Sequence, residues 1–174
     1  AKAGDSINFT VTFSEAVQTS SVSTGSFTVT NGTVSSVTPV NATNGAAVAY
    51  TVVVAPVLGV ASGTVALSVK DTVLDVAGNA TVSADLSGLD SQAIDTLAPV
   101  VSTVNDNITG VAKAGDSISF TVTFSEAVQT SSVSAGSFTA TNGTVASVTP
   151  VNATNGAAVA YTVVVTPALG VASG

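Results

Sequence analysis

The sequence predicts an all-β protein, built of tandem sandwich domains with about seven antiparallel strands each. Three observations lead to this fold class: apolar and polar residues alternate along short runs, Asn-Gly pairs separate the runs, and residues 1–63 recur at 112–174. Alternation with a period of two is typical of half-buried strands, and no run has the 3.6-residue period of an amphipathic helix. Two packed sheets are the usual way for such strands to bury one face.

The internal repeat sets the size of the folding unit. Ala1 aligns with Ala112 and Gly63 with Gly174, an offset of 111 residues, and 57 of the 63 aligned pairs are identical. This period suits a small domain, because the units of solenoids and propellers are about 20–50 residues long. We therefore expect two domains, 1–95 and 96–174, cut from a longer array. The first would lack its first strand and the second its last strands.

Each strand is predicted from its own run of residues. The clearest is 117–125, where Ile118, Phe120, Val122 and Phe124 share one face. Within one period we expect strands A to G, in order, at 99–104, 117–125, 137–141, 144–150, 158–165, 64–69 and within 81–94. Pro99 is compatible with the start of a strand, where its missing N–H costs nothing.

Turns and core follow from the same pattern. Asn31-Gly32, Asn44-Gly45 and their copies tolerate positive φ, so they are predicted to be tight hairpin connections. The large apolar side chains are predicted to form the core, namely Phe9, Phe13, Phe27, Tyr50 and their copies.

The composition excludes most enzyme and nucleic-acid-binding classes. The chain has no His, Cys or Trp, and three basic side chains stand against ten acidic ones, a formal net charge of -7. It therefore has no imidazole base, no thiolate nucleophile and no His or Cys zinc ligand. Three basic residues are too few for the phosphate contacts of a nucleic-acid-binding protein. No apolar run approaches the roughly 20 residues of a membrane helix. We expect no enzyme, no nucleic-acid partner and no membrane insertion of this segment.

The acidic residues are the remaining candidates for chemistry. Five of the eight acids in one period fall between Asp85 and Asp116, around the predicted domain boundary. The loops of a sandwich gather at two poles, because successive strands alternate in direction. We expect Asp95 and Glu126 to meet at one pole and to bind calcium there, with Asp5 or Asp90 of the preceding domain as further ligands. Converging carboxylates repel one another unless a cation intervenes, and calcium prefers such oxygen ligands.

A second acidic group is predicted at the equivalent pole of the first domain. It comprises Glu15, Asp71, Asp75 and Asn79. For Asp75 and Asn79, which flank Gly78, hydrogen bonding within a turn explains the residue types as well as calcium ligation does. For Asp106 and Asp116 the turn interpretation is the stronger one.

The order of four motifs resembles a known family. Asp95-Thr96-Leu97-Ala98-Pro99 precedes Gly115-Asp116-Ser117 and the strand end Phe124-Ser125-Glu126-Ala127-Val128, and Asp75-Val76-Ala77-Gly78-Asn79 lies late in the period. Together they resemble bacterial immunoglobulin-like (Big-type) repeats, the tandem extender domains of giant surface adhesins and biofilm-associated proteins. The resemblance implies a Greek-key immunoglobulin-like sandwich, an extracellular location, secreted or on the bacterial surface, and a stalk stiffened by calcium.

The predicted function is therefore a structural extender of a bacterial adhesin, which supports cell adhesion or biofilm formation. Its expected partners are neighbouring repeats of the same chain. One alternative is a self-assembling extracellular matrix filament or surface-layer protein, whose partners are other copies of the chain. Another is a carbohydrate- or protein-binding module. The six differences between the repeats exchange small residues and supply no aromatic or charged cluster for such a site.

Overall fold

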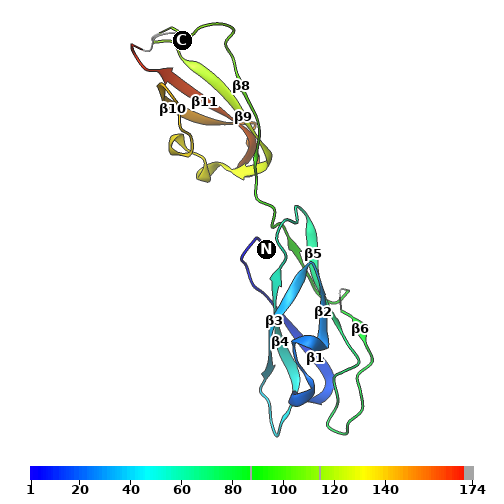
Figure 1. Cartoon of the computed structure of the whole chain (residues 1–174). Coiled ribbons are helices and arrows are strands. Elements are labelled where there is room, and N and C mark those ends of the chain that lie inside the picture. The colour runs from blue at the N-terminus through cyan, green and yellow to red at the C-terminus, as the bar shows by residue number, and fades with distance from the viewer. Residues whose placement is uncertain (87, 114, 171–174) are drawn as a thin grey trace. The chain divides into compact units, whose positions relative to one another are not determined.

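The computed structural model describes residues 1–86, 88–113 and 115–170, and it divides into two compact units, Ala1–Ala98 and Pro99–Gly174 (Figure 1). Strands dominate both units. The only helices among the described residues are four 3₁₀ turns of three residues: η1 (Thr19–Ser21), η2 (Thr24–Ser26), η3 (Thr130–Ser132) and η4 (Ala135–Ser137). The predicted all-β class is confirmed. Over those same ranges, no helix is long and apolar enough to cross a membrane.

The first unit is a sandwich of two antiparallel sheets. Its strands are β1 (Ile7–Gln18), β2 (Phe27–Thr30), β3 (Gly32–Val40), β4 (Ala46–Pro56), β5 (Gly63–Val69), β6 (Ala84–Asp85) and β7 (Ser91–Ile94). One sheet has the order β1-β4-β3, and the other has the order β2-β5-β6 with β7 also on β5. The strand predicted within 81–94 is thus split, because β6 pairs with Ser68 and Val69 whereas β7 pairs with 63–66.

The second unit contains one antiparallel sheet. Its strands are β8 (Val101–Asp106), β9 (Ile118–Gln129), β10 (Gly143–Val151) and β11 (Ala157–Pro167), in the order β10-β11-β9-β8. In the letters of the predicted strands, β8, β9, β11 and β10 are strands A, B, E and D, which share one sheet. In the first unit, β2 is strand C, β5 is strand F, and β6 with β7 forms strand G, and these share the other sheet. This is the strand order of an immunoglobulin-like sandwich.

One predicted strand of the second unit is absent. Residues 138–140, within the range expected for strand C, are not assigned to a strand, although their copies in the first unit belong to β2. β2 is held by pairing with β5, and the copy of β5 would begin at residue 174, outside the described residues. An isolated extended segment has no ladder hydrogen bonds to hold it, which explains the difference.

The two units differ in the extent of their cores. In the first unit, 14 buried residues form one cluster that joins β1 and β4 to β5. In the second, the cluster contains Val122, Val163 and Val165. Phe9, Phe27 and Tyr50 are buried as predicted, and Phe13 packs edge-on against the Tyr50 ring with centroids 5.8 Å apart.

The Asn-Gly pairs form two different kinds of connection. At Asn44-Gly45, with φ of 51° and 76°, the flanking Thr43 and Ala46 exchange both backbone hydrogen bonds, so the predicted hairpin is confirmed. The prediction is wrong for Asn31-Gly32, because β2 and β3 lie in different sheets. The Asn31 side chain donates to the carbonyl of Thr64 on β5, which fastens this corner between the sheets.

The units divide three residues after the predicted boundary, because Thr96 belongs to the first unit. Its side chain is buried, donates to the carbonyl of Val57 at 2.7 Å and accepts from the N–H of Val60 at 3.0 Å. The N–H of Leu97 also donates to the carbonyl of Val60. These bonds fasten the chain to the first unit up to residue 97.

Gly32→Ala is predicted to destabilise the first unit by about 1–3 kcal/mol, because it overpacks the corner between the sheets. A Cβ at this position would lie 2.7 Å from Cγ1 of Val54. The measurement is urea denaturation. Gly88→Ala is the control, since its Cβ would meet open space. Equal stability of the Gly32→Ala variant and the native chain would contradict the account.

Candidate functional site

Three of the four residues predicted at the pole of the first domain line one pocket. This carboxylate pocket has a volume of about 390 Å³ and lies where β1 meets the 71–82 loop. Glu15 comes from β1, and Asp75 and Asn79 come from the loop. Asp71 is exposed in a turn and does not line the pocket. The fold thus brings one carboxylate from β1 and one from the 71–82 loop to the same pocket.

Asp75 uses both carboxylate oxygens to hold its own turn. Oδ1 accepts from the backbone N–H of Asn79 at 2.7 Å, and Oδ2 accepts from the side-chain amide of Asn79, also at 2.7 Å. The N–H of Gly78, at φ 93°, donates to the carbonyl of Asp75. Donation by the Asn79 side chain and then by backbone N–H groups lowers the pKa of Asp75. The turn role is therefore directly visible, and calcium ligation by these residues stays a prediction.

The same loop is fastened to the end of β1. The N–H of Gln18 donates to the carbonyl of Leu74, and the Gln18 amide donates to the carbonyl of Asp75 at 2.9 Å. Ser21 in η1 accepts from the N–H of Leu74 at 2.9 Å. The pocket is thus the seam between β1 and the loop. No signal in the sequence identifies Gln18 or Ser21 as its anchors, because each is a single polar residue outside any motif.

The residues predicted at the domain junction are divided between the two units. Asp95 lies in the first unit, where its Oδ1 accepts from the N–H of Leu97 at 3.3 Å. Glu126 lies on β9 in the second unit. One of its oxygens, Oε1, is buried and has no hydrogen-bond partner among the described residues. Their pairing around a cation stays a prediction.

Asp5 and Asp90 line different pockets of the first unit. Asp5 lies beside Ala1 and Gln92, and its carboxylate accepts from the N–H of Lys2 at 2.9 Å. Asp90 lies in a small apolar pocket beside Phe9 and Leu86. Over the described ranges, no three acidic side chains gather closely enough to form a metal site by themselves.

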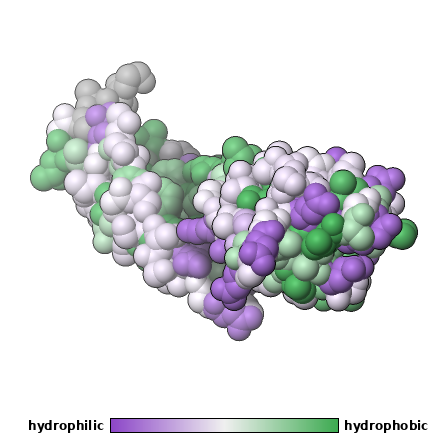
Figure 2. Space-filling model, turned by 90° about the horizontal axis from the view of Figure 1, so that it is seen from below, coloured by the Kyte–Doolittle hydropathy of each residue, from purple (hydrophilic) through white to green (hydrophobic). Residues whose placement is uncertain are grey.

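Asp106 and Asp116 hold turns, as the sequence indicates. The carboxylate of Asp106 accepts from the N–H of Ile108 at 3.2 Å, and that of Asp116 accepts from the N–H of Lys113 at 2.7 Å. On the face in Figure 2, small groups of hydrophilic and hydrophobic residues lie among larger areas of intermediate hydropathy. Asp5, Asp95, Asp106 and Asp116 therefore each accept a hydrogen bond from a nearby backbone N–H.

Comparison with known proteins gives one finding. A family model described as a bacterial Ig-like domain matches residues 1–90, which is more than half of the chain. The match runs from before β1 to the segment that precedes β7. Neither the curated proteins nor the solved structures contain a match to the chain.

Asp75→Asn is predicted to lower the melting temperature at pH 7, measured with a chelator present. The folded state depresses the pKa of Asp75 below the ordinary value of about 3.9. The ionised carboxylate therefore stabilises the fold above about pH 4, and this contribution is lost as the pH falls through the lower, folded-state pKa. The difference between native and variant chains should shrink over that range.

The control for this experiment is Asp71→Asn, which removes the same charge from an exposed position four residues earlier. This control variant should have nearly the melting temperature of the native chain at pH 7 and at pH 2. A constant difference between native and Asp75→Asn chains from pH 7 to pH 2 would show that the charge has no stabilising role.

Proposed function

Because the chain belongs to the bacterial Ig-like domain family, we propose that it is a structural extender of a secreted or surface-anchored bacterial adhesin. Successive sandwich units set the length of a stalk that supports cell adhesion or biofilm formation. The observation that carries this proposal is the 111-residue repeat, with 57 of 63 aligned residues identical. Identical units add length without adding a new binding site, so the number of repeats determines reach. The partners of each unit are its neighbours in the same chain.

The two units are joined by a short segment of the chain. The last backbone hydrogen bond into the first unit is made by Leu97. In the second unit Val100 is fastened to β9, because its N–H donates to the Ser125 side chain and its carbonyl accepts from the Ser125 N–H at 2.8 Å. Only Ala98 and Pro99 separate these anchors. The proline ring fixes its own φ and also restricts Ala98 to extended conformations, so this link has few degrees of freedom.

Calcium at the junction is the second part of the proposal. Asp95 is two residues before Leu97, and Glu126 directly follows Ser125, so both carboxylates are close in sequence to the anchors of the link. The buried Oε1 of Glu126 lacks a hydrogen bond among the described residues, and a buried charged oxygen is costly without a partner. A calcium ion shared with Asp95 satisfies that oxygen, and Asp5 or Asp90 of a neighbouring unit completes the ligand set.

A second calcium position is proposed at the carboxylate pocket. Glu15 and Asp75 supply carboxylates, Asn79 supplies an amide oxygen, and Asp71 lies four residues before Asp75 in the same loop, outside the pocket lining. Each Asp75 oxygen accepts one hydrogen bond from Asn79 and retains a lone pair for a cation. Calcium here would tighten the seam that already joins β1 to the loop.

The calcium proposal predicts that the Asp95→Asn/Glu126→Gln chain loses binding heat in calorimetric titration with Ca²⁺. The native chain is expected to bind with a dissociation constant of about 10⁻⁴–10⁻³ M, the range of extracellular modules, and to melt at a higher temperature when saturated. The matched control is Asp106→Asn/Asp116→Asn, which removes the same charge from two turn acids. Equal binding by all three chains would contradict the junction site.

The extender proposal predicts that length grows in proportion to repeat number. The longest strands, β1 and β9, each have 12 residues, so each unit is about 40 Å long at about 3.4 Å per residue. Proteins with two, three and four complete repeats should therefore gain a constant increment of about this size in maximum dimension, measured by small-angle X-ray scattering. Growth with the square root of repeat number would indicate a flexible string instead.

A further inference from the structure

Strand β3 forms an open edge of its sheet, and so does its copy β10 in the second unit. The sheet orders are β1-β4-β3 and β10-β11-β9-β8, so each of these two strands has a single neighbour, β4 or β11. Each has nine residues and no charged side chain. An edge of this kind leaves a row of backbone N–H and C=O groups outside the ladder, and such a row can pair with a strand of another chain.

This open edge belongs to the whole repeat. The first unit contains the predicted strands B to G, and of these β2, β5, β6 and β7 lie in the other sheet. The second unit shows the place of strand A, because β8 pairs with β9 at the opposite edge of the sheet. Every strand of one period is thus accounted for in the two units, and β3 pairs with β4 alone among those that the structure describes.

A proline stands in each open edge. Pro39 of β3 lies opposite Tyr50 of β4, and Pro150 of β10 lies opposite Tyr161 of β11. A proline has no N–H to donate, and it is accepted in a ladder where its nitrogen points away from the neighbouring strand. The Pro39 nitrogen therefore faces the open edge. A strand that approached this edge would lose one hydrogen bond and would meet the proline ring.

The same edge strands also contain a β-bulge. In β3 the register with β4 shifts between Val34 and Ser36, so Ser35 is the extra residue. In β10 the extra residue is Ala146. A bulge bends and twists its strand, which makes it a poorer template for pairing. Residues 36–38 are the part of β3 that lies between the bulge and the proline, a short run for a ladder.

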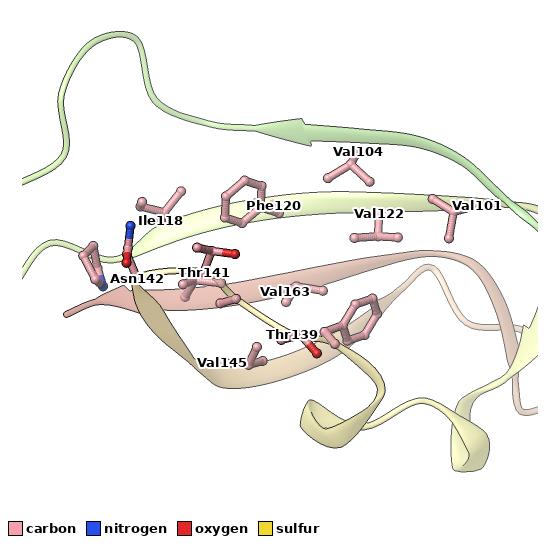
Figure 3. Close-up of a pocket in the computed structure, with 14 residues that line it drawn as sticks. Val101, Val104, Ile118, Phe120, Val122, Thr139, Thr141, Asn142, Val145 and Val163 are labelled. Carbon is pink, nitrogen blue, oxygen red and sulfur yellow. The ribbon is translucent and has the colours of Figure 1, made fainter. Parts of the chain in front are cut away.

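The side chains of these strands give little protection by themselves. Val34 and Val37 of β3 pack against the core, and Thr38 is exposed on the other face. In β10, Val145 lies on the same apolar side of the sheet as Val163 of β11 (Figure 3). Lysine is the residue that most often keeps an edge from pairing, and neither strand has one. An uncharged strand rich in Val and Thr is prone to pair with its own copies when it lacks proline.

We propose that Pro39 and Pro150 are stop residues, which keep the β3 and β10 edges from pairing with the same edges of other copies of this chain. The two edge strands differ only at Ser35 and Ala146, so the edge of any unit matches the edge of any other. Pairing of two such edges would join separate sandwiches into one continuous sheet. The stop residues keep each unit separate at the high local concentration of repeated domains.

The test replaces both prolines by valine, which restores an N–H at each edge and has high β propensity. The Pro39→Val/Pro150→Val chain should associate in sedimentation velocity at concentrations at which the native chain is monomeric. Amide hydrogen exchange at Val37 and Val148 should slow by at least about tenfold in the associated form. Each of these amides is two residues before a substituted proline, so its N–H points to the same side of the strand.

Two further variants separate edge pairing from damage to the fold. Pro56→Val/Pro167→Val is the matched control, because it removes two prolines at the ends of the central strands β4 and β11, and it should stay monomeric. Adding Thr38→Lys/Thr149→Lys to the Pro39→Val/Pro150→Val chain should restore the monomer. Both threonines are exposed, and a charge on an edge strand opposes pairing.

Any of four results would overturn the proposal. The Pro39→Val/Pro150→Val chain could stay monomeric, or it could associate without slower exchange at Val37 and Val148. Association that the two lysines do not reverse would assign it to another surface or to unfolding. Association of the native chain with exchange at Val37 already slowed would show that the prolines do not protect the edge. These outcomes do not depend on calcium or on the extender role.

Discussion

The packing of β5 against β1 and β4 is the contact on which the rest of the repeat depends. β5 is the central strand of its sheet, since β2, β6 and β7 all pair with it. Its side chains Val65 and Leu67 are 0% and 2% exposed, and they cover the apolar face of the opposite sheet. Each aliphatic side chain fully buried in this way contributes about 1.5–3 kcal/mol. Nearly identical strands in the second unit, without this cover among the described residues, retain a core cluster of three residues.

A few polar side chains hold the loops and chain ends that lie outside this core. Asp75 closes the loop that meets the end of β1, Asn31 fastens the corner between the sheets, and Thr96 holds the end of the first unit. Only 7% of the residues are charged, and hydrogen bonds of this kind fix these loops. Five of the eight acids in one period lie within residues 85–116 of the sequence, before and after the link between the units. A domain whose loops are held by a few internal hydrogen bonds suits the proposed role of a spacer, which must keep its shape in every repeat of the chain.

The strands and their order could be predicted from the sequence, because alternation reports directly which face of each strand is buried. Asn31-Gly32 could not be assigned, since positive φ specifies a tight corner but not which sheet the next strand joins. The prediction of strand C in the second repeat was wrong for a related reason. The sequence of residues 138–140 is nearly that of β2, but a strand also needs hydrogen bonds to a partner strand that is distant in sequence. At the candidate site, Asp75 and Asn79 could be paired from their motif. The anchors Gln18 and Thr96 could not, because their role depends on carbonyl groups brought close only by the fold.

The most direct test of the role of β5 is native-state hydrogen exchange on the amides of Val52 and Val54, measured in the native chain and in a Leu67→Ala variant. Val52 and Val54 lie on β4, which pairs with β1 and β3, whereas Leu67 lies on β5 in the opposite sheet. If β5 supplies most of the stability, these amides should exchange at least about 30-fold faster in the variant, because Leu67 is 2% exposed and replacing a buried Leu by Ala costs about 2–5 kcal/mol. Equal exchange rates in the two chains would show that the β1–β4 sheet is stable by itself and would contradict the central role of β5.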